Sequence, residues 1–219
     1  MKIPIYGYFL ASFQSLGLEK LLIMKKPKTF LHLALSILFL APVISCSSDE
    51  EGDDTGGGTV SNTLHLKFKT PDWERTINCE HLDLMPMNPA DGVFAVSATS
   101  ASTNETFYFS YPQDSSEMNQ VSNYKKYGIV GYGDNNAPFQ FSQKLPDNQG
   151  SNDRLISLAD NPAAYYNEVE KIEYIGHEAD YSIFKVKCKY NMRTYLLSNE
   201  ATIKDVSGTF HFKIRTTRN

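Results

Sequence analysis

Hydrophobic and polar residues alternate with a period of two along most of the chain after residue 60. The clearest cases are TLHLKFK (63–69), ETFYFSY (105–111) and GTFHFKIR (208–215), where every second side chain is apolar. Successive side chains of a strand point to opposite faces, so this pattern indicates strands with one buried face. Further strands are expected at 75–84, 92–99, 126–132, 138–143, 169–175, 181–190 and 200–205.

Polar segments rich in turn-forming residues separate these strands, notably 88–92, 133–136, 146–150 and 176–180. Many short strands with such breaks predict an all-β fold. We expect an antiparallel β-sandwich, with a small β-barrel as the alternative. One short helix is expected after Asp160, because Asn161 suits an N-cap and Pro162 suits the first helical position.

The segment before residue 60 follows another pattern. An apolar run at 30–43 comes after a basic stretch at 24–28 and ends shortly before Cys46. A basic region, a short apolar core and a small residue together indicate a secretory signal. The run is short for the roughly 30 Å hydrocarbon core of a membrane, and acidic residues follow it.

The residues around Cys46 resemble the lipobox of bacterial lipoproteins, in which the cysteine is lipid-modified and becomes the new N-terminus. Val43, Ile44 and Ser45 precede the cysteine, and Ile44 departs from the commonest form of the family pattern. The resemblance implies that Cys46 carries the lipid anchor. The alternative is an ordinary secretory signal with a coincidental cysteine.

An acidic run follows the cysteine and resembles the export signal of surface-exposed lipoproteins of Bacteroidota. The residues concerned are Ser48, Asp49, Glu50 and Glu51. The leader, the β-rich body and the final strand VSGTFHFKI (206–214) together look like the small lipoproteins of that group with an uncharacterised β-rich domain. The resemblance implies a protein anchored by lipid in the outer membrane and exposed at the cell surface. A run of acids and glycine is also typical of a solvated linker, and both interpretations can hold together.

These observations divide the chain into four parts. Residues 1–23 fit poorly before a leader, so we interpret them as an upstream extension ahead of a natural start at Met24. Residues 24–45 are the expected signal peptide, 46–59 the lipidated cysteine with its tether, and 60–219 a single β-sandwich domain, the natural number for this length.

The distribution of charge argues against nucleic acid as a partner. The leader holds five lysines and one glutamate, so the chain after it has 16 basic and 24 acidic residues, a net charge of −8. Five of these acids lie in the tether, which leaves the domain near −3. A nucleic-acid-binding domain would show a basic excess.

Two cysteines remain in the domain, Cys79 and Cys188, and an exported protein meets an oxidising compartment. Both share a strand face with apolar residues, which predicts burial. A disulfide would close a loop of about 109 residues and stabilise the fold by up to about 4.7 kcal/mol. The alternative is two free buried thiols, because unpaired cysteine is among the most often buried residues.

No motif for catalysis, cofactor binding or metal binding stands out. No nucleophile elbow occurs, the glycines at 128–133 do not lead into a helix, and no His-Glu-x-x-His or Cys-x-x-Cys is present. The histidines of the domain lack ligand spacing, and His65 and His211 are expected on the solvent face of their strands. We therefore predict no metal, no cofactor and no catalytic residues.

Two features are candidates for binding. One is a set of aromatic residues at expected loops and strand ends, since exposed rings suit sugars and interfaces; aromatic residues also favour strands by propensity. These are Trp73, Tyr111, Tyr124, Tyr127 and Tyr132.

The other is a set of basic residues on the polar faces of three expected strands. If those strands adjoin, the residues form a positive sheet face suited to an anionic glycan or an acidic partner. Separation of the strands, or neutralisation by acids such as Glu170 and Glu173, is the alternative. The set is Lys67, Lys69, Lys185, Lys187, Lys189, His211, Lys213 and Arg215.

The leading hypothesis is a lipid-anchored cell-surface protein, not an enzyme, whose β-sandwich domain binds a ligand or partner, either glycan or another envelope protein. A structural or envelope-assembly lipoprotein without a small-molecule site is the second hypothesis. The third is a hydrolase with an unrecognised pair of carboxylates.

Overall fold

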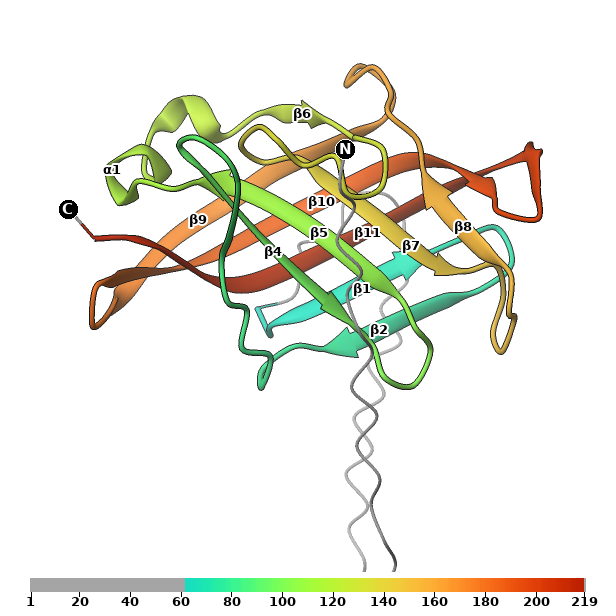
Figure 1. Ribbon diagram of the computed structural model, residues 1–219, viewed down its shortest axis with the longest axis horizontal. Helices are drawn as coiled ribbons and strands as arrows, with labels where there is room; N and C mark the ends of the chain where they lie inside the picture. Colours follow the sequence, from blue (N-terminus) through green and yellow to red (C-terminus); the bar gives the residue numbers. More distant parts are fainter. Residues whose placement is uncertain (1–61, 219) are drawn as a thin grey trace, which may run out of the picture. The chain divides into compact units, whose positions relative to one another are not determined.

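The structure is a computed structural model that describes residues 62–218, and within them the protein is built almost wholly of strands (Figure 1). The one α-helix described is α1 (Ser115–Met118), followed by a short 3-10 turn, η1 (Val121–Asn123). The strands are β1 (His65–Lys69), β2 (Glu74–Asn78), β3 (Met87–Ala90), β4 (Val93–Thr99), β5 (Thr106–Pro112), β6 (Lys126–Gly128), β7 (Phe141–Pro146), β8 (Arg154–Ser157), β9 (Tyr166–Glu178), β10 (Tyr181–Leu196) and β11 (Asn199–Thr217).

The strands form one antiparallel sheet in the order β2-β1-β11-β10-β8-β7-β5-β4-β3. The long strand β10 pairs with β11 over nearly its whole length, from Tyr181 opposite Thr217 to Leu196 opposite Asn199. On its other side β10 pairs first with β9 and then, near its end, with β8. Because β10 has two successive partners, the sheet divides there and its two parts can fold over one another.

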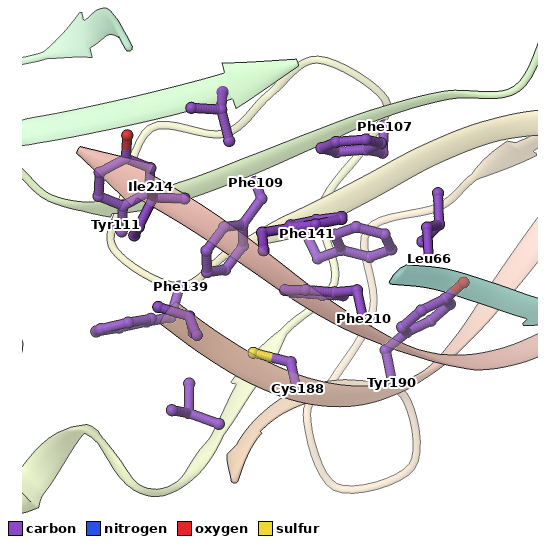
Figure 2. Packing of buried hydrophobic residues seen from close by; sticks show 14 of the residues in the cluster. Leu66, Phe107, Phe109, Tyr111, Phe139, Phe141, Cys188, Tyr190, Phe210 and Ile214 are labelled. Atoms are coloured by element: carbon purple, nitrogen blue, oxygen red, sulfur yellow. The ribbon is translucent and has the colours of Figure 1, made fainter. Parts of the chain in front are cut away.

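Aromatic side chains from the two parts meet in the core, as Figure 2 shows. Phe212 of β11 stacks on Phe107 of β5, with ring centroids 4.5 Å apart, and Phe210 lies 4.9 Å from Phe109 of β5 and from Phe141 of β7. All of these rings except Phe107 are wholly buried. The inner faces of β11 and of β5 and β7 therefore pack together, which gives the sandwich-like, all-β fold that the alternation predicted.

Interactions at the margins hold the two parts together. Arg75 of β2 forms an ion pair with the buried Glu105, which precedes β5, over 3.5 Å. At the other end the N–H of Thr217 donates to the carbonyl of Gln113 over 2.8 Å. The second strand, β2, and the last strand, β11, are therefore both tied to the β4–β5 region.

The expected strand faces are confirmed in β1, β5 and β11, where the residues predicted to point inward are buried. These are Leu66 and Phe68 in β1, Phe107, Phe109 and Tyr111 in β5, and Phe210, Phe212 and Ile214 in β11. The segments 200–205 and 208–215, expected as two strands, form the single strand β11. The alternation missed β3 and β8, which are only four residues each.

The position of the predicted helix is wrong. Asn161 and Pro162 begin a turn, in which the N–H groups of Ala164 and Tyr165 both donate to the carbonyl of Asn161. The chain enters β9 at Tyr166 immediately afterwards, so the helix has no room to continue. The short helix lies at α1 instead, where the Asp114 side chain accepts from the N–H of Ser116 over 2.7 Å.

Candidate binding face

The strands that carry the basic residues do adjoin. β1, β11, β10 and β9 lie side by side in Figure 1, and their registers place His65 opposite His211, His211 opposite Lys187, and Lys187 opposite Lys171. Their outward side chains form one surface, which we call the basic face. It consists of His65, Lys67, Lys69, Lys171, Lys185, Lys187, Lys189, His211, Lys213 and Arg215.

Hydrogen bonds organise the centre of the basic face around the chain segment that precedes β1. The Nδ1 atoms of His65 and His211 lie 2.8 Å and 3.1 Å from the carbonyl oxygen of Thr63. A carbonyl only accepts, so both Nδ1 atoms carry the proton. The ammonium of Lys187 donates to the side-chain oxygen of Asn62.

The two histidines differ at their second nitrogen. The Nε2 of His65 accepts from the hydroxyl of Thr209 over 3.0 Å. The Nε2 of His211 is buried without a hydrogen-bond partner in the described part of the chain. With Nδ1 protonated, this atom holds an unshared lone pair.

The expectation that His65 and His211 lie on a solvent face is wrong in one respect. Both point away from the aromatic core, yet each is only 3 % exposed. Burial lowers the pKa of His65, and it lowers the pKa of His211 to about 4, with nearby Lys187 acting in the same direction on both. The two imidazoles are therefore neutral near pH 7, and Lys187 supplies the charge at the centre.

Acidic residues neutralise the margin of the basic face more than its interior. Lys171 pairs with Glu173 over 2.9 Å, and Lys189 lies 3.4 Å from Glu168 and 3.3 Å from Glu170. At the far end of β11, Glu178 and Asp83 hold Arg215, and Glu178 lies 3.9 Å from Lys213.

The lysines inside that margin have no such partners. Lys67, Lys69 and Lys185 form no ion pair among residues 62–218, although Glu74 lies opposite Lys69 and Glu173 opposite Lys185 in register. Lys67 and Lys185 are half-buried, and Lys69 is exposed. The interior of the face therefore carries positive charge that is free of ion pairs in the described residues, although the charge of Lys185 contributes to lowering the pKa of Glu173 opposite it.

Two of the five aromatic candidates belong to the fold. Tyr111 is wholly buried, so its proposed place at an exposed strand end is wrong. It points inward because its parity in β5 matches that of Phe109. Trp73 packs edge-on against Phe68, with centroids 4.9 Å apart, and its Nε1–H donates to the carbonyl of Pro146 over 3.2 Å.

The other candidates are also engaged by neighbouring groups. The hydroxyl of Tyr124 donates to the carbonyl of Ile172 and accepts from its N–H, both over 3.3 Å. Burial raises the pKa of Tyr127 to about 12, and its hydroxyl donates to the carbonyl of Asn123.

Tyr132 lies edge-on to Tyr108, with ring centroids 5.4 Å apart, and the ammonium of Lys144 lies 5.1 Å from its ring. In the described residues no ring contact joins any two of the five candidates, Trp73, Tyr111, Tyr124, Tyr127 and Tyr132. The structure therefore does not assemble them into one aromatic platform.

Cys79 and Cys188 are both buried and both free. Burial raises the pKa of the Cys79 thiol to about 11 and also raises that of Cys188, so both are protonated near pH 7. The structure thus has the free buried thiols rather than the disulfide. The Cys188 sulfur accepts a long contact of 3.7 Å from the amide of Asn167.

Several expectations rest on residues outside the described range, namely the leader, Cys46 and the acidic run from Ser48 to Glu51. Among the described residues, no three of histidine, cysteine, aspartate and glutamate gather as a possible metal site. No helix within 62–218 is long and apolar enough to span a membrane. No family model, curated protein or solved structure matches this chain.

Sequence reasoning missed Lys171 and the role of Asn62 and Thr63. Strict alternation from the buried Val169 would place Lys171 on the inner face, and a bulge in β9 between these two residues turns it outward instead. The contacts of Thr63 with His211 and of Asn62 with Lys187 join residues 148 and 125 positions apart. No local pattern carries such a signal.

Proposed function

We propose that this protein is a lipid-anchored cell-surface protein whose β domain binds an anionic partner without catalysing a reaction. The anchor is Cys46, and the resemblance to a lipobox supports that part of the proposal. The binding surface is the basic face.

One observation supports this function above the others, namely that the strands with outward basic residues are neighbours. Lys67 and Lys185 lie on strands that flank β11, and neither forms an ion pair within residues 62–218, although Glu173 lies opposite Lys185 on β9. Exposed like charges on adjoining strands destabilise a sheet. Their concentration here is therefore a cost to folding that an anionic partner would offset.

The chemistry of the face favours binding over hydrolysis. A carboxylate pair is needed for the general acid and base of a glycosidase. The acids near the face instead bind lysines and Arg215 at its margin. The central imidazoles both donate to one backbone carbonyl, which holds them in place as structural groups.

Binding can be tested with polygalacturonate, an acidic glycan, and with dextran as the neutral control. The mature protein in non-ionic detergent should be retarded by polygalacturonate alone in affinity electrophoresis. The double variant Lys67→Gln/Lys185→Gln should bind roughly five- to thirtyfold more weakly, because each exposed charge contact contributes about 0.5–1 kcal/mol.

A matched variant has the same change of charge elsewhere. The side chains of Lys125 and Lys144 lie over the rings of Tyr127 and Tyr132, outside the basic face. Lys125→Gln/Lys144→Gln should therefore bind polygalacturonate like the parent. Equal losses from the two double variants would show that net charge alone is measured, and the proposed face would be wrong.

A further inference from the structure

The described chain begins on the basic face itself. Asn62 accepts a hydrogen bond from Lys187, and the carbonyl of Thr63 accepts from both His65 and His211. Three side chains from three adjacent strands thus hold the first two described residues over the centre of the face. The point at which the chain enters the domain is fixed there and is not free to move to another surface.

The anchor expected at Cys46 lies sixteen residues before Asn62. A chain of that length spans at most roughly 55 Å when fully extended. The membrane that holds the anchor is therefore always within this distance of the centre of the basic face. Of the outward surfaces of the domain, the basic face is the one from which the anchored chain departs.

The charge of the face suits that position. Lys67, Lys69 and Lys185 surround the entry point without ion pairs in the described residues, while the acids lie at the margin. A membrane surface with anionic headgroups attracts basic residues that approach within about a Debye length, roughly 10 Å at 0.1 M salt. This attraction favours the orientation in which the lysines that form no ion pairs face the membrane.

We propose that the anionic partner of the basic face is the phosphate-bearing headgroup layer of the membrane that carries the anchor, so that the domain lies face-down on it. This rests on the proposed function and names its partner. The outer surfaces of β4, β5 and β7, on the other side of the aromatic core, then face away from the membrane.

The single tryptophan of the chain, Trp73, is a native probe for this orientation, because it lies directly between β1 and β2 and its ring is held by Phe68 and Pro146. The lipidated mature protein is reconstituted into phosphatidylcholine vesicles containing a dansyl-labelled lipid, with and without phosphatidylglycerol. Energy transfer from Trp73 should be greater with phosphatidylglycerol. The increase should be lost as salt is raised from about 0.1 M to about 1 M, where the Debye length falls to about 3 Å.

Acylation of amines, mapped by mass spectrometry, gives an independent measurement on the same vesicles. Phosphatidylglycerol should slow modification of Lys67, Lys69 and Lys185, and it should leave Lys144 unchanged. Lys67→Gln/Lys185→Gln should lower energy transfer to the level in pure phosphatidylcholine, whereas Lys125→Gln/Lys144→Gln should not. Unchanged Trp73 emission in detergent would show that both variants are folded.

The outcomes separate this inference from the proposed function. If phosphatidylglycerol changes neither energy transfer nor acylation while polygalacturonate still protects the three lysines, the membrane is not the partner and the proposed function stands. If neither the vesicles nor polygalacturonate protects them, both proposals fail. Protection of Lys144 to the same degree would also overturn the orientation, since it lies on the opposite surface.

Discussion

The two faces of β11 are made of residues that alternate one by one, and both are buried at the middle of the strand. On the inner face Phe210 and Phe212 are 0 % exposed, with ring centroids 4.6 Å apart. On the outer face His211, between them in sequence, is 3 % exposed and donates to the carbonyl of Thr63. The two faces are thus buried to a similar extent, one by apolar rings and the other by a hydrogen-bonded imidazole.

The difference shows which face stabilises the fold. Each large apolar side chain on the inner face contributes roughly 1.5–3 kcal/mol when buried. The outer face gains a hydrogen bond at His211, worth about 1 kcal/mol, but leaves the Nε2 atom without a partner. We therefore expect the inner face to supply most of the stability of the fold, and the outer face to contribute charge and contacts with a partner.

The largest expected effect is on the inner face. Phe212→Ala should lower the free energy of unfolding by about 3–5 kcal/mol, because the wholly buried ring stacks on both Phe107 and Phe210. Urea unfolding followed by circular dichroism would measure it. Lys213→Ala, one residue along on the outer face, should cost less than about 0.5 kcal/mol. Similar losses from the two variants would refute the assignment of the faces.

A smaller effect is expected where β11 has no side chain on its inner face. A Cβ at Gly208 would overlap the carbonyl oxygen of Lys67 and the hydroxyl of Tyr190, and the first of these is backbone. Gly208→Ala should therefore cost about 1–3 kcal/mol through overpacking.

The neighbouring substitution Ser207→Ala, on the exposed side, is the matched control and should change the urea midpoint little. A Gly208→Ala protein as stable as the parent would show that β1 and β10 approach β11 less closely at this point.

The smallest effect concerns protonation on the outer face. Burial lowers the pKa of His211 to about 4, while an unfolded histidine has a pKa near 6.5. The unfolded state therefore binds more protons between these values, and stability should fall as the pH falls from about 6.5 toward 4. We expect a loss on the order of 1–2 kcal/mol.

Unfolding free energies measured across this range should show the loss in the parent and a flatter profile in His211→Gln. The control His81→Gln changes an exposed histidine and should keep the profile of the parent. A hydrogen bond from Ser198 lowers the pKa of Asp153, and one from Lys171 lowers the pKa of Glu173. The stability that these two carboxylates contribute is therefore lost at lower pH than the contribution of His211. If the free energy of unfolding of His211→Gln fell with pH as steeply as that of the parent, His211 would not be buried as the structure shows.

Strong alternation of apolar and polar residues predicted the strands that define the core. Strands with a weak or short pattern were not predicted. The inward residues of β1, β5 and β11 could be found because three large apolar side chains in each strand leave one arrangement that buries them all. β8 has only four residues, too few for a period to show. The helix expected after Asp160 did not form, because local cap preferences are weaker than the pairing of β9 with β6 and β10.

The candidate site was predictable in composition and not in arrangement. The sequence shows which residues of β1, β10 and β11 are basic and share a polar face. Whether those strands adjoin depends on the order of strands in the sheet, in which β1 lies next to β11 although the residues that they pair are 138 to 146 positions apart.

The sequence by itself determined the class of fold and the two faces of each principal strand, because side-chain direction in a strand follows from backbone geometry alone. Only the tertiary structure decided that Lys67, Lys185 and Lys213 share one surface and that Glu168, Glu170 and Glu178 lie at its margin. It also decided that His65 and His211 are buried and neutral. These properties depend on contacts across strands, and solvent exposure and charge separation are set by those contacts, not by the order of residues.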